Sequence, residues 1–407
     1  MHIYKINCKR LCIFVIIQIL LVSSYYYTRR DTNTSLDGKK ISFINSGNIK
    51  KSTKKTYHTQ GNQIVLDKQK VRDKFVDFNS SLCFLSGTDI KSMNRLKNSW
   101  TCNCKTGWHG SECGQPEVIW RALLKHRNKI NIKGFRQFAR RMLYIFQVDE
   151  FVENLVDIRI NDLNEVIDLF ILIENEGNRI EKSLKNNFLK KFHNKILYLQ
   201  GIGLDNVWHT ILSSLPSLEN DDIILVSKSY EIPNKFALSF FKYYDKWPEP
   251  ISLRLRWSVF GFFWKHPSKT KTEGVICSVK YMQDIFNSNF SMLLNNRIVK
   301  GLIIGDLNHY GGWYCEFCLD PEQIIRLANT RSDVKFSNWK ELKKGIIDAS
   351  YIEDLIGNGL YIDGKTELER SRKYQDSYFA PNYVLENSLQ FDYLQINLYT
   401  KLDYYEG

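Results

Sequence analysis

The stretch DDIILVSKSYEIPNKFALSFFKYYDKWPEPISLRLRWSVFGFFWKHP, residues 221–267, decides the fold. Its apolar run Ile223–Val226 is long enough for one buried strand. A polar turn, residues 227–230, leads to Glu231-Ile232-Pro233, where the proline prevents further strand pairing. The second half mixes basic and aromatic residues. In α/β proteins ligands bind where strands end in loops, and aromatic faces beside basic groups suit an anionic nucleotide and a sugar.

The chain around this stretch alternates in the manner of an α/β domain. The alternating segments are 142–148, 155–160, 166–173, a basic helix at 180–193, 196–199 and a short helix at 208–215. This order predicts a largely parallel sheet, whose carboxyl edge carries residues 174–176 and 227–231. Basic residues at helix-like intervals predict a surface helix over 123–140.

Several motifs recur in a fixed order over residues 80–395. They are Glu231-Ile232-Pro233, Glu249-Pro250, Arg256, Ser258, Gly261–Lys265 with Pro267, His309–Cys318, Tyr361–Gly364 and Tyr378–Tyr383. Together they resemble glycosyltransferase family 17, the bisecting β-1,4-mannosyl-glycoprotein N-acetylglucosaminyltransferases. The resemblance implies a GT-A-like nucleotide-sugar transferase domain over 120–400. It also implies transfer of N-acetylglucosamine from UDP-GlcNAc to the core mannose of an N-glycan on a glycoprotein.

One departure from the family pattern concerns the metal. Where the family has an Asp-rich run that holds Mn²⁺ or Mg²⁺, this chain has Ser227-Lys228-Ser229-Tyr230. Such hard cations prefer anionic oxygen ligands, so we expect weakened metal binding and assign no metal ligand. Lys228 can itself neutralise a diphosphate. The alternative function is a catalytically inactive relative that binds glycans or nucleotide sugars.

The candidate site residues follow from these motifs. A transferase that inverts the anomeric centre needs a base for the acceptor hydroxyl. Candidates for this base are Asp306, His309 and Glu322. The residues expected to bind the donor are Glu174, Lys228, Glu231, Arg256 and Lys265. Those expected to bind the acceptor are Trp264 and Trp313. Structural alternatives to these roles stay open. Glu231 can be a helix cap, since Pro233 can open a helix. Arg256 and Lys265 can form a basic edge at the surface, and the aromatic residues can belong to the core.

The cysteines predict a small disulfide module before the main domain. Cys102-x-Cys104-x-x-Gly107-Trp108-x-Gly110-x-x-Cys113 has the spacing of the C-terminal half of an EGF-like module. We expect a stub at 81–115 with disulfides Cys83–Cys102 and Cys104–Cys113. A zinc site is the alternative to these disulfides, and it is disfavoured because this segment has no second Cys-x-x-Cys or His pair to complete the ligands. The pairing of Cys277, Cys315 and Cys318 stays open. An adhesion protein built on the stub is disfavoured by the long α/β region.

The N-terminal region has the pattern of a secretory-pathway membrane protein. Residues 11–27 are apolar and follow Lys5, Lys9 and Arg10, which predicts a signal anchor behind a cytoplasmic tail at 1–10. A signal peptide cleaved near residues 22–24 is the alternative. Residues 28–80 are polar and predict a flexible stem. The predicted location is therefore the Golgi membrane, single-pass type II, with sequons at Asn33, Asn79 and Asn289.

The net charge of +13 does not by itself indicate a nucleic-acid partner. The basic residues are spread along the chain without a run of recognition length, so we expect no nucleic acid to bind.

Overall fold

The computed structural model describes residues 56–78, 81–95, 101–125, 130, 132–175, 177–204, 206–295, 301–330 and 347–400, together with Gln18. The predicted cytoplasmic tail, the rest of the predicted anchor, residues 28–55 and the sequons at Asn33 and Asn79 lie outside these ranges. Among the residues just given, no helix is both long and apolar enough to cross a membrane.

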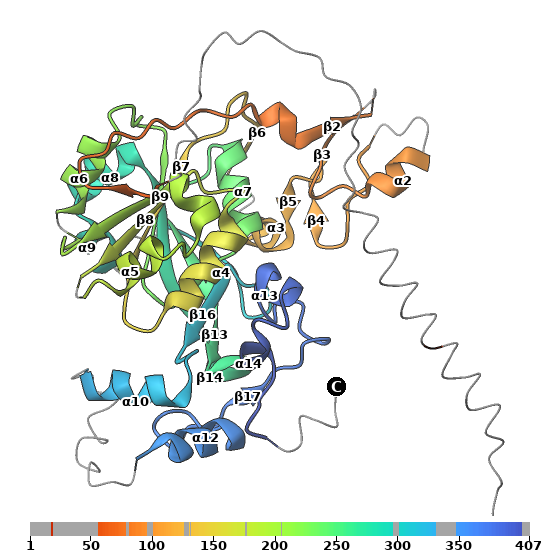
Figure 1. The fold of residues 1–407 in the computed structure, drawn as a ribbon. Helices are drawn as coiled ribbons and strands as arrows, with labels where there is room; N and C mark the ends of the chain where they lie inside the picture. The colour runs from red at the N-terminus through yellow and green to blue at the C-terminus, as the bar shows by residue number, and fades with distance from the viewer. Residues whose placement is uncertain are drawn as a thin grey trace, which may run out of the picture. The chain divides into compact units, whose positions relative to one another are not determined.

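The first half of the sheet is parallel and alternates with helices, as the sequence predicts (Figure 1). Strands β7 (Met142–Val148), β8 (Leu169–Glu174), β9 (Ile196–Gln200) and β10 (Ile223–Ser227) lie in the order β9-β8-β7-β10. Between them run α4 (Glu153–Leu163), α5 (Arg179–Lys185), the 3₁₀ helix η3 (Lys190–Lys195) and α6 (Val207–Ser214). The strand order reverses between β7 and β10. Such a switch point opens a crevice at the carboxyl ends of the two strands.

The second half of the sheet is mixed, while the sheet as a whole is mostly parallel, as the sequence predicts. Strand β14 (Gly261–Ser278) lies antiparallel to both β10 and β13 (Ile251–Val259). Strand β16 (Gly312–Glu316) is parallel to β13 and antiparallel to β11 (Glu231–Pro233), and β15 (Leu302–Ile304) and β17 (Glu369–Arg370) pair at the sides. The basic and aromatic stretch at 254–265 therefore forms a β-hairpin whose residues alternate between two faces.

Apolar residues cover both faces of the sheet. On β7, Leu143 and Ile145 pack in a cluster that includes residues of α6, α8 (Val279–Phe286) and α9 (Phe290–Asn295). Tyr144 and Phe146 pack on the other face with residues of α4 and α7 (Lys235–Tyr243). Because both faces are covered, the parallel strands are apolar at nearly every position.

The disulfide stub forms as the cysteine spacing predicts. It contains β3 (Leu82–Phe84), α2 (Ile90–Arg95), β4 (Trp108–His109) and β5 (Gln115–Pro116), and β2 (Phe75–Asp77), which precedes the predicted bounds of 81–115, pairs with β3. The disulfides Cys83–Cys102 and Cys104–Cys113 are both present. The pairing left open by the sequence is Cys315–Cys318, and Cys277 is a buried free thiol.

Residues 56–78 differ from the flexible stem expected up to residue 80. Strand β1 (His58–Thr59) joins the main sheet beside β9, and a 3₁₀ helix η2 (Val71–Lys74) follows. Ile64 and Val71 are buried, and the Ile64 amide donates a 2.8 Å hydrogen bond to the Ser214 carbonyl. This segment is therefore part of the folded unit.

The predicted helix over 123–140 is wrong. Helix α3 (Glu117–Leu124) ends where the predicted helix was expected to begin, and β6 (Lys133–Phe135) pairs with β12 (Tyr244–Asp245). Two of the basic residues that produced the helical pattern, Arg136 and Arg140, are used in ion pairs instead.

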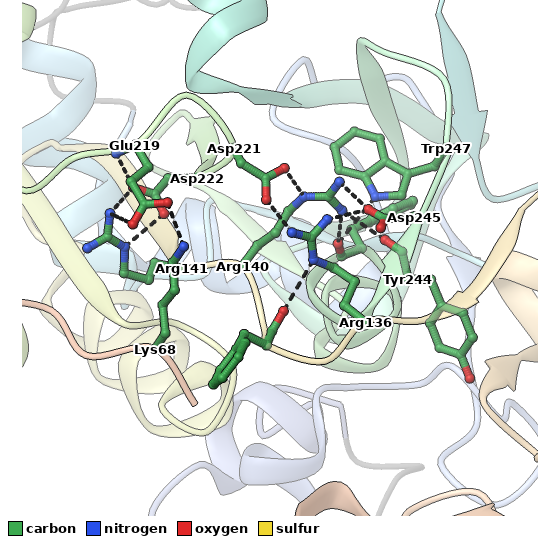
Figure 2. Close-up of polar contacts among 12 residues, drawn as sticks. Lys68, Arg136, Arg140, Arg141, Glu219, Asp221, Asp222, Tyr244, Asp245 and Trp247 are labelled. Atoms are coloured by element: carbon green, nitrogen blue, oxygen red, sulfur yellow. Dashed lines mark hydrogen bonds and ion pairs between the residues drawn. The ribbon is translucent and has the colours of Figure 1, made fainter. Parts of the chain in front are cut away.

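Figure 2 shows these ion pairs, which join three separate segments of the chain. Arg136 and Arg140 each contact both Asp221 and Asp245 at 2.5–2.8 Å. The neighbouring Arg141 lies 2.5 Å from Asp222, and the pair is almost fully buried. The cluster lies at the amino ends of β7 and β10, opposite the crevice, so Asp221 and Asp222 stabilise the fold at that end.

The C-terminal region completes the fold with helices. These are α10 (Pro321–Thr330), α12 (Ala349–Asn358), α13 (Asn382–Glu386) and α14 (Asp392–Gln395). The loop before α13 lies against Trp313 of β16, whose indole N–H donates 2.8 Å to the Tyr378 carbonyl. This contact brings the last part of the chain to the functional region described next.

Candidate functional site

The turn after β10 lies at the crevice where the sequence places the donor. Ser227 is fully buried, and its hydroxyl lies 2.7 Å from the Tyr144 hydroxyl, so the core holds it. The Lys228 side chain is 44% exposed, with its Nζ 3.3 Å from Glu273. The turn therefore presents one cation to solvent, at a position where the family pattern has a carboxylate.

Glu231 follows this turn and is almost fully buried. One of its oxygens accepts the Lys228 amide at 2.9 Å, and the other, Oε2, has no hydrogen-bond partner. Burial raises the pKa of Glu231 to about 8, so its carboxyl is mostly protonated at neutral pH. The cap interpretation of Glu231 is wrong, because Asn234 caps α7 by accepting the Phe236 and Ala237 amides.

The residues of this turn do not fit a two-carboxylate metal site. The only carboxyl in the Glu-Ile-Pro motif is the buried Glu231, and Lys228 adds a positive charge beside it. Across the described residues, no group of three or more His, Cys, Asp or Glu side chains is placed to hold a metal ion. A hard cation prefers several anionic oxygens, which this turn lacks.

A second cation lies beside the turn in an aromatic setting. Lys271 Nζ is 3.9 Å from the ring centroids of both Trp257 and Tyr314, and 3.5 Å from Glu316. Glu316 also accepts the Trp257 indole N–H at 2.7 Å. Lys271 and Glu273 are two residues apart on β14 and so share a face. No sequence motif reveals this cluster, because its members come from three strands that only the observed pairing brings together.

A pocket of about 420 Å³ lies between the stub and the main domain, at the Pro233 end of β11. A volume of this size suits a small ligand. From the stub and the start of α3 it is lined by Thr106, Gly107, Trp108, Pro116, Glu117 and Val118. From the main domain it is lined by Asp162, Asn234, Lys235, Phe236, His309, Trp313, Ser377, Tyr378, Ala380 and Asn382. Two residues predicted from the sequence, His309 and Trp313, therefore lie in one cavity.

His309 is held in this pocket by Asp306. The Asp306 carboxylate accepts the amides of Asn308 and His309 and lies 3.1 Å from His309 Nδ1. Although partial burial acts to raise the pKa of Asp306, these hydrogen bonds bring it below the usual value. An ionised carboxylate only accepts hydrogen bonds, so a neutral imidazole that donates from Nδ1 to Asp306 has its lone pair on Nε2. This geometry suits a general base.

Glu117 lies across from His309 and was not identified from the sequence. Its Oε1 is 3.9 Å from His309 Nε2, and its carboxylate accepts hydrogen bonds of 2.5 Å from His109 and Arg121. The hydrogen bond from His109, joined by that from Arg121, lowers the pKa of Glu117 despite its partial burial. No motif marks Glu117; only the packing of the stub reveals its position.

The predicted donor residues Glu174 and Arg256 are both engaged by the protein. Glu174 is buried at the end of β8 and accepts the Arg179 and Ile180 amides and the Tyr198 hydroxyl. Arg256 is fully buried and lies 3.2 Å from Asp376, just before the loop residues that line the pocket. Its direct contact with a donor stays a prediction, as does that of Glu174.

The remaining predicted residues lie outside the pocket. Lys265 pairs with Glu369 at 3.0 Å, and Trp264 donates its indole N–H to the Ile356 carbonyl of α12. Glu322 is exposed in the first turn of α10. The Asn289 side chain accepts the Met292 amide at 2.9 Å, and its use as a glycosylation site stays a prediction.

The chain is distantly related to known glycosyltransferases. It is 27% identical over 345 residues to the rat beta-1,4-mannosyl-glycoprotein 4-beta-N-acetylglucosaminyltransferase, covering 74% of this chain and 63% of the relative. For the human enzyme of the same name the identity is 27% over 357 residues, covering 77% of this chain and 66% of the relative. The chain thus spans less than two thirds of the length of these relatives. No protein-family model matches the chain.

Among solved structures, the chain is similar to the mannosyltransferase PcManGT of Pyrobaculum calidifontis, in complex with GDP-Man and Mn²⁺. The TM-score is 0.31 at 11% sequence identity, and the match covers 57% of this chain and 72% of that one.

Proposed function

We propose that this chain transfers N-acetylglucosamine from UDP-GlcNAc, in β-1,4 linkage, to the core mannose of N-glycans. The observation that carries the proposal is the pocket in which Asp306 orients His309, in a chain related along most of its length to such enzymes. The order of strands around β7 and β10 agrees with a GT-A-like domain over residues 120–400, whose nucleotide binds at the switch point.

The donor diphosphate binds at the turn after β10. Lys228, partly exposed there, neutralises the charge that develops on the leaving UDP, and Lys271 lies on the neighbouring strand face. These lysines are now paired with Glu273 and Glu316, so the diphosphate competes with carboxylates for them. Because the turn does not fit a metal site, Mn²⁺ or Mg²⁺ would be held mainly by the phosphates and is not needed for the step described here.

The acceptor mannose binds in the pocket beside His309. Its 4-hydroxyl oxygen attacks the anomeric carbon of the donor, the bond to UDP breaks, and the hydroxyl proton passes to His309 Nε2. Asp306 is a positioning residue that stabilises the imidazolium formed. The step is a single displacement and inverts the anomeric centre.

The N-terminal segments predicted from the sequence complete the proposal. An anchor at residues 11–27 places the domain in the Golgi lumen, where its partners are glycoproteins and no nucleic acid takes part. The two stub disulfides support an oxidising compartment.

The test is a transfer assay with UDP-GlcNAc and a core N-glycan, comparing the wild type with His309→Gln and Asp306→Asn. We expect His309→Gln to lower kcat by on the order of 10²–10⁴, because general base catalysis contributes that much. Asp306→Asn should lower kcat less and shift its pH profile, since it acts through His309. His209→Gln, an exposed histidine on α6, is the matched control. Unchanged kcat in His309→Gln would refute the assignment of the base.

A second candidate function is supported by one observation. The turn at 227–230 contains no carboxylate, so the chain can also be interpreted as an inactive relative that binds glycans or nucleotide sugars. Binding of UDP-GlcNAc and glycan without any turnover, with or without Mn²⁺, would favour this function.

A further inference from the structure

We propose that the disulfide stub is one wall of the acceptor site, and that Trp108 supplies the face on which an acceptor sugar stacks. The inference rests on the proposed function for the identity of the ligand, a neutral glycan. The sequence alone describes the stub as a separate module that precedes the catalytic domain.

The two walls of the pocket come from different parts of the chain. The stub contributes Thr106, Gly107 and Trp108, and the main domain contributes Phe236 and His309 on the other side. Trp108 is half-buried, and its ring centroid is 5.2 Å from that of Phe236, in an edge-on arrangement. An aromatic surface that is still partly open to the cavity can pack against the C–H face of a pyranose ring.

The stub is fixed against the main domain by contacts that leave little freedom. Tyr244 donates its hydroxyl to Glu112 at 2.9 Å. A Cβ at Gly114 would lie 1.6 Å from that hydroxyl oxygen, so only glycine allows the approach. Trp108 also packs on Phe84 within the stub, with the two ring centroids 5.7 Å apart. The stub wall is therefore pre-organised, which lowers the entropic cost of binding a ligand.

Polar groups in the pocket match the hydroxyls of a sugar. Glu117 follows the stub directly, and its amide donates 2.8 Å to the Gly107 carbonyl. Its carboxylate is ionised at neutral pH, because the hydrogen bond from His109 lowers its pKa. Asp162 and Asn382 line the same cavity. Carboxylates and amides around an aromatic face are the groups that orient a neutral polyhydroxyl ligand.

The experiment fills the pocket from the stub side. Thr106 is exposed on the cavity wall, so Thr106→Trp adds an indole there without disturbing the core; Ser111→Trp places the same group on an exposed stub position outside the pocket. We expect Thr106→Trp to raise the acceptor KM at least about tenfold, equivalent to ~1.4 kcal/mol of binding. The affinity for UDP should not change, and Ser111→Trp should behave as the wild type. Trp108→Phe, which keeps an aromatic ring, should raise the KM less.

The outcomes separate this inference from the proposed function. Transfer with an unchanged acceptor KM in Thr106→Trp would overturn the inference and leave the function standing. If the wild type transfers nothing, binding of a core N-glycan is measured by saturation-transfer NMR. Binding to the wild type that Thr106→Trp abolishes and Ser111→Trp keeps would support the stub wall although the enzyme proposal fails. Binding equal in all three proteins, or none in any, would overturn the inference.

Discussion

Burial makes the side chain of Glu231 a weaker acid than a surface glutamate. Its pKa is about 8 in the folded chain against an ordinary value of 4.5, because desolvation disfavours the charged form. A carboxyl whose pKa is raised by folding makes its full contribution to the stability of the fold at pH values below its pKa in the unfolded chain. This contribution is lost as the pH rises through the pKa of the carboxyl in the folded chain, because the unfolded chain releases its proton at lower pH.

We therefore expect the stability of the wild type to fall between pH 4.5 and about 8 relative to that of Glu231→Gln. The difference should reach a few kcal/mol, about 1.4 kcal/mol for each unit by which the pKa is raised. Urea unfolding at several pH values measures it, with the exposed Glu322→Gln as control. Parallel pH curves for the wild type and Glu231→Gln would mean that the carboxyl is ionised in the fold.

A substitution of Lys228 tests whether this lysine takes the place of a metal ion at the turn after β10. Because Ser227 and Ser229 are buried, an aspartate at either position would place a carboxylate in the core, so the informative change is Lys228→Ala. We expect kcat to fall on the order of 10²-fold, more than binding of the donor weakens. The exposed Lys280→Ala is the control. If the wild type loses all activity in a chelator and Lys228→Ala keeps full activity, the lysine does not replace the metal.

At the scale of the elements, the sequence predicts the strands well and the connections poorly. The strands at 142–148, 196–199 and 223–226 are found nearly as expected, because long apolar runs covered on both faces have few alternatives. The segment 56–78 was interpreted as a stem because Ile64 and Val71 stand isolated among polar residues. Their burial depends on contacts with distant segments, such as that of Ile64 with Ser214, which no local pattern reveals.

Hydrogen exchange can test whether residues 56–78 are part of the fold. The amides of Ile64 and Val71 donate to the carbonyls of Ser214 and Gln137 at 2.8 and 3.1 Å. We expect both to exchange slowly, in contrast to amides at exposed positions of the same segment, because buried bonded amides open only on local unfolding. Fast exchange throughout 56–78 would restore the interpretation of this segment as a stem.

At the scale of the whole molecule, the site is assembled from parts that the sequence treats separately. His309 and Trp313 were candidates from their motif, and the structure brings both into the pocket. Trp108 and Glu117 were not candidates, because their proximity to His309 depends on how the stub packs on the main domain. Trp264 looked like a sugar platform by its motif, but it packs against α12.

The central claim is that the chain is an N-acetylglucosaminyltransferase, and product analysis tests it most directly. The protein is incubated with UDP-GlcNAc and a core N-glycan, and the product is examined by mass spectrometry and NMR. We predict the gain of one N-acetylhexosamine, β-1,4-linked to the core mannose, with release of UDP and weak dependence on Mn²⁺. A folded protein that binds UDP-GlcNAc but adds no sugar to the glycan, with or without Mn²⁺, would contradict the claim.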